Sequence, residues 1–274
     1  MVNNRQEVFA LDIGTRTIAG LVVRREDRSN NILAYEIIEH ESRVMYDGQI
    51  HDIEEVAKGV RKIKRKLEEK VGYQLSKAAV AAAGRALYTI EGKAEKSISP
   101  FIEITEEDIR GLETDALSDA IKKLSNNDKK KTFQNYYCVG YSPVKWFLND
   151  ECLDNLLGQK GHHISVKIVA SFLPRTVVEG LLTVLERCDL KLDSLTLEPI
   201  AAGDVVVLPG MRKLNIALVD IGAGTSDIAL SKDGSIFAYG MVPIAGDEIT
   251  ERICEKFLLD FEEGERAKRE LLTK

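Results

Sequence analysis

One short pattern occurs twice in this chain: an apolar strand that ends in Asp-Ile-Gly, a tight turn of Gly and Thr, and a second apolar strand. The first copy covers residues 8–23 and the second residues 216–230. Glycine permits positive φ values and lets backbone N–H groups approach an anion that a Cβ would hold away. A single copy would be explained equally well by a plain β-hairpin. Two copies predict two turns that face each other as a two-sided clamp for phosphate.

Each copy also carries side chains suited to a phosphate and its cation. Thr15 and Thr17 in the first copy and Thr225 in the second offer hydroxyl donors. Asp12 and Asp220 each end an apolar strand, where a carboxylate is a poor phosphate ligand but a good holder of Mg²⁺ and its water molecules. Phosphate, metal and carboxylate would then balance in charge.

The elements around the two copies follow the same order. Around the first, the patterns predict strands over 8–11, 18–24 and 32–38, a helix over 52–71 ended by Gly72, and a strand over 77–83 that rejoins the sheet by a crossover. Around the second, they predict a strand over 235–242 and a helix from about Asp247, in which Ile249, Ile253 and Phe257 share one apolar face. Two βββα halves predict an α/β protein of two similar domains with a cleft between them.

The segment between the halves is unlike either of them. It shows strand patterns over 87–98 and 136–147 and a helix over 104–124, opened by Thr105 and Asp108 at the spacing of a capping box. A strand over 166–172, a helix over 175–188 and a strand over 194–197 follow. We therefore expect a first domain over residues 1–84 and 164–198, an inserted α+β subdomain over 85–163, and part of a second domain over 199–274.

Composition narrows the class of protein. With 274 residues, 44% hydrophobic and 30% charged, the chain is expected to be globular, and its net charge of −6 gives no reason to expect a nucleic-acid partner. The four cysteines lie far apart with no CxxC pair, which favours a reducing cytoplasm over a zinc site or a disulfide framework. The N-terminal residues lack the pattern of a signal peptide, and no apolar stretch is long enough to span a bilayer.

Taken together, the motifs resemble those of the actin, Hsp70 and sugar-kinase superfamily of ATPases, and within it the bacterial cell-division family FtsA. DIGTRT at 12–17 is similar to the superfamily's first phosphate motif and DIGAGTSD at 220–227 to its second. LEPIAAGDVVV at 197–207 resembles the connecting helix, VPIAGDEIT at 242–250 the phosphate-side loop, and GERAKREL at 264–271 the helix facing the nucleoside. MYDGQIHDIEEV at 45–56, ITEEDI at 104–109 and LLGQKGHHISVKIVASFLP at 156–174 favour FtsA within the superfamily. The resemblance implies actin-like, ribonuclease H-like βββαβ halves, the first with an FtsA-type (1C, SHS2-like) insert and the second incomplete.

The resemblance also implies that Mg²⁺ and ATP bind between the two turns. Asp12 and Asp220 would hold the metal, and the phosphates would lie against Gly14, Thr15, Arg16, Thr17, Gly222, Ala223, Gly224 and Thr225. Gly246 would approach the phosphates from the other domain, and Glu265 and Lys268 would lie near the ribose or base. Glu198 and Asp227 are candidates for a role at the hydrolytic water. Glu198 could equally be a structural hinge residue before Pro199, and Asp227 could simply brace its turn through backbone hydrogen bonds.

Three departures from the family pattern shape the expected activity. Thr17 stands where FtsA proteins usually carry a lysine that reaches the phosphates, so we expect ATP hydrolysis to be slow or absent. Ala223 and Ala245 replace usual glycines, which restricts the backbone only where φ is positive. The chain stops at Lys274, before the Gly-rich adenosine motif, so we expect a fragment or truncated form that binds nucleotide weakly.

Two functions of different classes fit these features. The first is an FtsA-like assembly factor of the cytoplasm whose nucleotide site acts as a switch, which self-associates and binds division or PilM-like pilus-assembly proteins, and which reaches the membrane only peripherally. The second is an enzyme of the sugar-kinase or acyl-CoA-activator type. A kinase needs an aspartate base that we do not find in the first domain, and the activators need closely spaced cysteines. We therefore favour the assembly factor.

Overall fold

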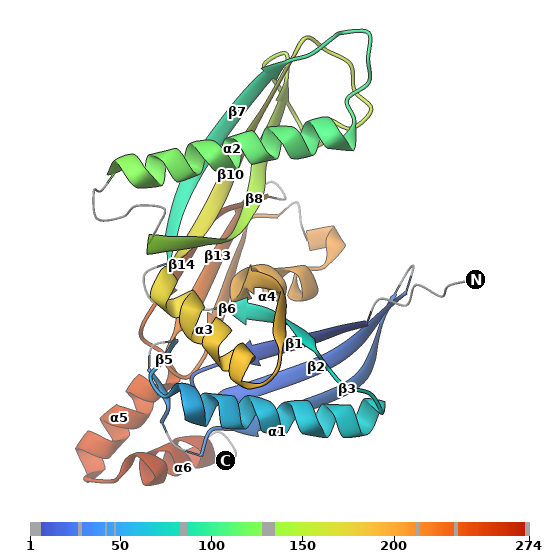
Figure 1. Ribbon diagram of the computed structural model, residues 1–274. Coiled ribbons are helices and arrows are strands. Elements are labelled where there is room, and N and C mark those ends of the chain that lie inside the picture. The colour runs from blue at the N-terminus through green and yellow to red at the C-terminus, as the bar shows by residue number, and fades with distance from the viewer. Residues whose placement is uncertain are drawn as a thin grey trace.

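The computed structural model describes residues 7–26, 29–41, 43–46, 48–82, 87–127, 135–211, 214–232 and 235–271. Within these ranges the chain builds three main sheets, one in each half and one in the inserted segment (Figure 1). None of the helices in these ranges is long and apolar enough to cross a membrane.

The first half is a five-stranded sheet in the order β11-β6-β1-β2-β3. Strands β1 (Glu7–Ile13), β2 (Thr17–Glu26) and β3 (Ser29–Glu39) form an antiparallel meander. Helix α1 (Ile53–Val71) then carries the chain to β6 (Lys77–Ala82), which pairs parallel to β1, and β11 (Lys191–Leu197) pairs parallel to β6. The predicted meander and crossover are therefore confirmed. Two short strands, β4 (Met45–Tyr46) and β5 (Gln49–Ile50), were not predicted.

Helix α1 covers one face of this sheet, beside α3 (Arg175–Arg187). It begins where the Asp52 carboxylate accepts the N–H groups of Glu54 and Glu55 at 3.0 Å, and ends at Gly72 with φ 81°. Its buried stripe recurs at the helical spacing that the sequence showed: Val56, Val60, Ile63 and Leu67. A Cβ at Gly20 of β2 would lie 2.4 Å from Ile63 Cγ2, so this glycine sets how closely helix and sheet pack.

The inserted segment forms an antiparallel sheet in the order β7-β10-β8-β9, with α2 (Glu106–Asn127) packed on it. Its strands are β7 (Tyr88–Ser97), β8 (Tyr136–Leu148), β9 (Glu151–Leu153) and β10 (His163–Pro174). The capping box before α2 is confirmed. Asp108 N–H donates to Thr105 Oγ1 at 3.3 Å, and Thr105 N–H donates to Asp108 Oδ2 at 3.2 Å.

Strand β10 belongs to the inserted sheet, which corrects the expectation that residues 166–172 lie in the first domain. It pairs along its length with β7 on one side and β8 on the other. The even-numbered residues from Ile164 to Phe172 face the core under α2, while Val169 and Leu173 face the core of the first half. Because both faces are buried, the strand reads as a continuous apolar run that fits either sheet. We propose that the domain boundary follows Pro174 and not residue 163.

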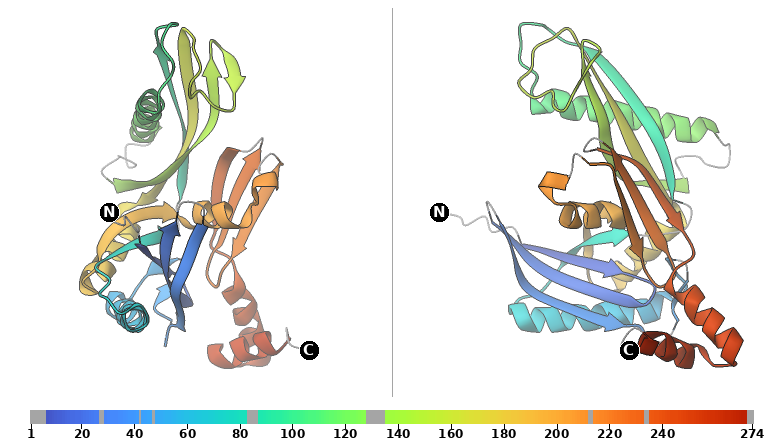
Figure 2. Two further views of the ribbon diagram at one scale, coloured as in Figure 1. Left: turned by 90° about the vertical axis from the view of Figure 1, so that its right-hand side faces the viewer. Right: turned by 180° about the vertical axis from the view of Figure 1, so that it is seen from behind.

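The second half repeats the order of the first: β12 (Ile216–Ile221), β13 (Ser226–Lys232), β14 (Ser235–Val242) and then helix α5 (Gly246–Phe257). Helix α4 (Glu198–Val206) connects the halves, a short 3-10 turn over Pro209–Met211 follows it, and α6 (Phe261–Leu271) packs on α5. The second-half sheet stands beside the inserted sheet (Figure 2), where Tyr239 and Ser142 share a hydrogen bond of 2.9 Å between their hydroxyls.

Helix α5 presents a different face to the molecule than its apolar residues suggested. Ile249 and Phe257 are 57% and 62% exposed, whereas the polar residues Asp247 and Thr250 are buried. The inward face is polar because it meets charged side chains of the first half and of α6, described below. Periodicity therefore located the helix correctly but assigned its buried side wrongly.

Candidate functional site

The two Asp-Ile-Gly turns have the same backbone structure. Gly14 N–H donates to the Thr17 carbonyl at 2.9 Å, and Gly222 N–H donates to the Thr225 carbonyl at 2.9 Å. Each bond closes a two-residue loop that continues the pairing of the flanking strands, β1 with β2 and β12 with β13. The repeated sequence therefore produces a repeated local structure.

The glycines act here through close approach and not through positive φ. Among the described residues the left-handed glycines are Gly48, Gly72 and Gly158. A Cβ at Gly14 would instead lie 3.2 Å from the Thr17 carbonyl oxygen, and one at Gly222 3.3 Å from the Thr225 oxygen. The expectation about φ is thus wrong, while the need for glycine at the turn stands because the closing hydrogen bond leaves little room.

The two alanines that replace family glycines cause no backbone strain. Ala245 has φ −157° and ψ −146°, an extended conformation open to any residue. Ala223 is not among the described non-glycine residues with positive φ. Both departures are therefore mild.

Four carboxylates converge between the halves, each from a different element. Asp12 comes from β1, Glu198 is the first residue of α4, Asp220 lies near the end of β12 and Asp227 lies in β13. Burial, followed by the charges of Asp12, Asp227 and Asp220, raises the pKa of Glu198 to about 8. Burial and the Asp220 charge also raise the pKa of Asp12. Side chains more than two hundred residues apart in sequence thus form one acidic cluster.

Asp227 braces the second turn through a side chain. Burial raises its pKa to about 6 despite a hydrogen bond with the Thr225 hydroxyl, which acts in the opposite direction. Both residues are buried, at 5% and 7% exposure. Asp227 is therefore in place to hold Thr225 and to lie beside the other carboxylates.

The acidic cluster suits a hard cation held through water. Repulsion among buried carboxylates is relieved by a divalent cation, and Mg²⁺ usually keeps several of its waters while using only one or two carboxylates. Within the described ranges, no three His, Cys, Asp or Glu side chains are placed to ligate a metal together. The donor set therefore fits the water-mediated arrangement expected for Asp12 and Asp220, which stays a prediction.

Gly246 lies against the second turn, but its amide is already used. Gly246 N–H donates to the Gly222 carbonyl at 3.1 Å, and Asp247 N–H donates to the Ala223 carbonyl at 2.8 Å. A Cβ at Gly246 would lie 3.2 Å from the Gly222 oxygen. The residue thus fastens the start of α5 to the second turn within the same half, and its expected approach to the phosphates stays a prediction.

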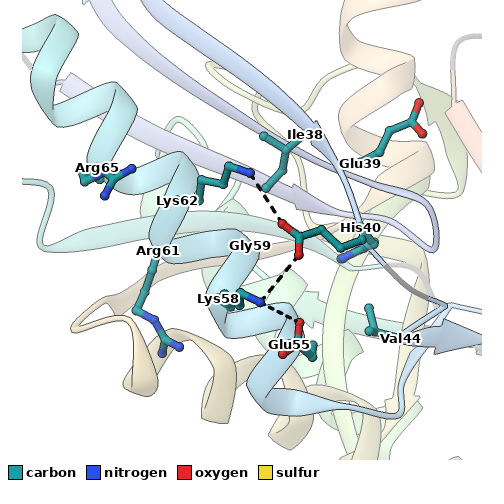
Figure 3. A pocket seen from close by; sticks show the side chains of 11 residues that line it. Ile38, Glu39, His40, Val44, Glu55, Lys58, Gly59, Arg61, Lys62 and Arg65 are labelled. Carbon is teal, nitrogen blue, oxygen red and sulfur yellow. Dashed lines mark hydrogen bonds and ion pairs between the residues drawn. The ribbon is translucent and has the colours of Figure 1, made fainter.

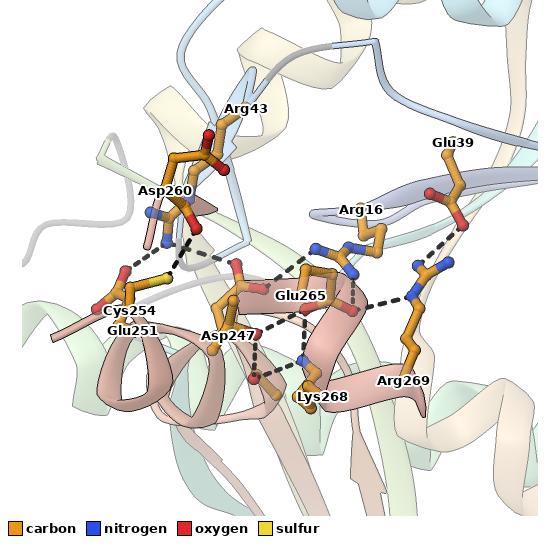
Figure 4. Close-up of polar contacts among 12 residues, drawn as sticks. Arg16, Glu39, Arg43, Asp247, Glu251, Cys254, Asp260, Glu265, Lys268 and Arg269 are labelled. Atoms are coloured by element: carbon orange, nitrogen blue, oxygen red, sulfur yellow. Dashed lines mark hydrogen bonds and ion pairs between the residues drawn. The ribbon is translucent and has the colours of Figure 1, made fainter. Parts of the chain in front are cut away.

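Glu265 and Lys268 lie on α6, close to the start of α5 (Figure 4). Glu265 is 9% exposed and accepts hydrogen bonds from Thr250 Oγ1 at 2.6 Å and Arg269 Nε at 3.0 Å. Lys268 Nζ lies 2.7 Å from the Glu265 carboxylate and donates to the Gly246 carbonyl at 2.8 Å. Burial acts to raise the pKa of Glu265, but its bonds with Lys268, Thr250, Arg269 and Arg16 outweigh that effect and lower it to about 2.

Arg16 extends away from its own turn. It pairs with Glu265, and its Nη2 lies 3.9 Å from Asp247 Oδ1. Its guanidinium carbon also lies 5.9 Å from the centre of the Phe261 ring. The first turn is thereby tied to α5 and α6, and the expected phosphate ligand Arg16 contacts the expected nucleoside ligand Glu265.

Two residues at the site were not found by sequence reasoning. His40, directly after β3, lies 3.1 Å from the Gly14 carbonyl through Nε2, and its N–H donates to the Arg16 carbonyl at 2.9 Å. Because a carbonyl only accepts, Nε2 carries the hydrogen, and burial lowers the pKa of His40. Arg43 lies 3.4 Å from Asp247 and donates to Glu251 at 2.8 Å. The predicted meander could have indicated both residues, because it brings the end of β3 beside the first turn.

Two hollows lie on either side of the segment that follows β3. The larger, of about 750 Å³, lies between the first turn and α6 and is lined by Arg16, Arg43, Phe261 and Glu265, among others. The smaller, of about 350 Å³, lies over α1 (Figure 3). There Glu41 pairs with Lys58 and Lys62, at 3.7 and 3.8 Å. Because these lysines are paired with a carboxylate, the hollow is better explained as part of the expected solvated face of α1 than as an anion-binding site.

Comparison with known proteins shows which families and structures the chain is similar to. A family model described as cell division protein FtsA matches residues 217–271. The cell division protein FtsA of Bacillus subtilis is 28% identical over 275 residues, which cover 98% of this chain and 59% of that protein. FtsA of Escherichia coli K12 is 27% identical over 257 residues, covering 93% and 58%. This chain is therefore similar in sequence to FtsA over most of its length.

Solved structures show the fold of the FtsA-like chain. The PilM-PilN type IV pilus biogenesis complex matches with a TM-score of 0.69 at 16% identity, covering 97% of this chain and 70% of that one. The ethanolamine utilization protein EutJ of Carboxydothermus hydrogenoformans matches with a TM-score of 0.54 at 19% identity, covering 96% and 61%. The fold is that of the actin-like ATPases, as the sequence predicted. The FtsA-like chain spans about three fifths of the length of these curated relatives.

Proposed function

We propose that the FtsA-like chain binds Mg²⁺ and ATP between its two Asp-Ile-Gly turns and uses the nucleotide as a conformational switch in a bacterial assembly process. The observation that carries this proposal is the pair of turns closed by the same hydrogen bond, with Asp12, Glu198, Asp220 and Asp227 converging between them. A nucleotide that bridges the two turns contacts both halves at once. Its presence or absence therefore biases their relative position.

Each residue of the site has a separate chemical role. The hydroxyl of Thr15 donates to phosphate oxygens, and His40 fixes the first turn through the Gly14 carbonyl. Bound Mg²⁺ would supply charge neutralisation of the phosphates, with its waters held by Asp12 and Asp220. Positioning and charge neutralisation are the main means of catalysing phosphoryl transfer, so turnover depends on how tightly these groups are fixed.

Glu198 is the group best suited to accept a proton from an attacking water, although its raised pKa leaves most of it protonated at neutral pH before a cation binds. Thr17, the first residue of β2, supplies no positive charge. We therefore propose slow hydrolysis at most, which suits a switch better than a rapid enzyme.

The role in the cell follows from the relatives. Bacillus subtilis and Escherichia coli FtsA are named as cell division proteins, and we propose that this chain serves division as a cytoplasmic scaffold that associates with itself and with division proteins. A pilus-assembly role is the second candidate, because the PilM-PilN complex matches 97% of the chain. Pull-down with each class of partner separates the two roles.

The test is a Mg²⁺-ATP titration by calorimetry, with phosphate release followed in the same samples. The double variant Asp12→Asn, Asp220→Asn keeps the shape of both carboxylates and removes their charge. We expect the wild type to bind and the double variant to lose at least tenfold in affinity, about 1.4 kcal/mol. Asp193→Asn, at an exposed position of β11, is the matched control and should bind as the wild type does.

Two results would count against the proposal. Equal affinity in the wild type and the double variant would mean that the carboxylates do not hold the cation. Rapid formation of ADP that depends on a small-molecule acceptor, with the phosphoryl group transferred to that acceptor, would indicate a kinase, the alternative class that the sequence leaves open.

A further inference from the structure

Strand β7 is an outer strand of the inserted sheet. It pairs along its length with β10 on one side, and on its other side it bonds to no strand among the described residues. Residues of an antiparallel strand alternate between those whose backbone N–H and C=O groups bond to the partner strand and those whose groups point away from it. A free edge ten residues long is a ready template for another extended chain, and proteins usually block such an edge.

Two side chains of α2 occupy this edge where a neighbouring strand would bond. The Lys93 N–H group donates to Asp119 Oδ2 at 2.9 Å, and Lys123 Nζ donates to the Glu91 carbonyl at 3.1 Å. The carboxylate takes the place of a strand's C=O group, and the ammonium takes the place of its N–H group. Asp119 and Lys123 also pair with each other at 2.7 Å. We call these two side chains the edge cap.

The packing of α2 across the inserted sheet brings the edge cap within reach of β7 (Figure 1). Gly92 lies between the two capped residues, and a Cβ there would be 2.2 Å from the Ala116 carbonyl oxygen and 3.1 Å from Ala120 Cβ. Asp119 and Lys123 are four positions apart, so they are neighbours on one side of the helix. The close contact at Gly92 therefore places the edge cap against the strand.

The edge cap can be displaced without disturbing the core beneath α2. The side chains of Asp119 and Lys123 are 33% and 45% exposed, and ion pairs this exposed to water contribute little. The core contacts of the helix come instead from Leu112, Ala116 and Ala120, which are fully buried. An added strand would offer hydrogen bonds at both capped positions and further bonds along the edge, so it could replace the edge cap by rotation of two surface side chains.

The side chains along β7 indicate which extended chain fits the edge. Glu91, Lys93 and Glu95 alternate in sign, and all three are exposed. Opposite charges on directly facing residues stabilise a strand pair, and like charges weaken it. A segment with Lys, Glu and Lys at alternate positions therefore matches this edge. A second β7 would bring its own α2 to the same face of the joined sheet, whereas a lone extended segment needs no room for a second helix.

We propose that the free edge of β7 is a docking site for an extended segment of a partner protein with alternating Lys and Glu side chains, and that the edge cap blocks this site until the segment displaces it. The site belongs to a different sheet from the two Asp-Ile-Gly turns, and its use does not depend on the nucleotide. Without the partner, the edge cap also keeps β7 from pairing with other chains.

The test is a binding titration with a defined peptide, Thr-Lys-Val-Glu-Val-Lys-Thr, labelled with fluorescein and followed by fluorescence anisotropy. We expect weak binding to the wild type and at least about tenfold tighter binding to the uncapped variant Asp119→Ala, Lys123→Ala, because the peptide no longer competes with the edge cap. The matched control is Asp115→Ala, Lys122→Ala, which removes the same two charges from exposed positions of α2 and should bind as the wild type does.

Two further changes place the binding on the β7 edge. Lys93→Pro removes the N–H group that an added strand must use, and it should abolish binding in the wild type and in the uncapped variant. Lys93→Gln keeps the N–H group and controls for the lost charge. The peptide N-methylated at both Lys residues and at Glu lacks the matching donors and should not bind. Hydrogen exchange of the β10 amides, which should stay protected in every variant, shows that the inserted sheet is intact.

Each result supports or overturns the proposal. Tighter binding by the uncapped variant that Lys93→Pro abolishes supports it. Equal affinity of the wild type and the uncapped variant overturns the blocking role of the edge cap. Binding that survives Lys93→Pro or N-methylation overturns the site, and so does the absence of saturable binding up to about 1 mM peptide. If sedimentation shows that the uncapped variant assembles with itself, and Lys93→Pro reverses this, the edge belongs to a second copy and the partner segment is overturned.

Discussion

The acidic cluster predicts an unusual dependence of stability on pH, centred on Glu198. This residue has a pKa of about 8 in the folded protein, against an ordinary value of 4.5 in an unfolded chain. Between these two pH values the native state keeps a proton that the unfolded state has released, so the free energy of unfolding falls as pH rises. The stabilising effect is complete below about pH 4.5 and is lost by about pH 8.

The size of the effect follows from the interval. At about 1.4 kcal/mol for each pH unit, the full interval corresponds to roughly 3–5 kcal/mol, and partial exposure of Glu198 to water favours the lower end. Glu198→Gln keeps the shape of the side chain but cannot ionise, so its free energy of unfolding lacks this slope. We take the difference in free energy of unfolding between wild type and variant near pH 4.5 as the baseline. By pH 8 the variant should have become about 3 kcal/mol more stable relative to the wild type.

The assay is urea unfolding followed by circular dichroism, at a series of pH values across this interval, in the presence of a metal chelator. Asp227, with a pKa of about 6, adds a fall of the same sign in both proteins. Glu255→Gln, at an exposed position of α5, is the control and should run parallel to the wild type. Parallel curves for Glu198→Gln and the wild type would refute the reasoning, because they would show that Glu198 ionises freely in the folded protein.

Two further predictions concern single contacts. His40→Leu removes the hydrogen bond to the Gly14 carbonyl and should weaken Mg²⁺-ATP binding by about threefold to tenfold, because the first turn is held less firmly. Calorimetry measures the affinity, and the melting temperature should stay within a few degrees of the wild type. Unchanged affinity would mean that His40 does not position the turn. Gly92→Ala should destabilise the inserted unit by about 1–3 kcal/mol, since its Cβ would lie 2.2 Å from the Ala116 carbonyl oxygen. Gly111→Ala, which has open space around it on α2, should instead stabilise the unit by about 0.5–1 kcal/mol. Urea unfolding that ranks the two variants in reverse would contradict the packing of β7 on α2.

Much of the fold follows from local patterns in the sequence. The alternating strands, the helical stripe of α1 and the capping box of α2 depend on interactions within a few residues, and all three are present in the structure. The duplicated turn is also local, because the hydrogen bond that closes it joins residues three positions apart. The elements and the turns of the candidate site were predictable for this reason.

The placement of charged side chains depended on the tertiary structure. Nothing near Arg16 in the sequence indicates Glu265, and the direction of a long flexible side chain is set by whichever partner the fold brings within reach. The same holds for the polar inward face of α5, the assignment of β10 to the inserted sheet and the role of His40. The sequence by itself determined the strands, the helices and the repeated turns, because these arise from short-range backbone geometry and periodic burial. The tertiary structure alone decided which carboxylates and guanidinium groups meet, because electrostatic contacts form between residues that only folding brings together.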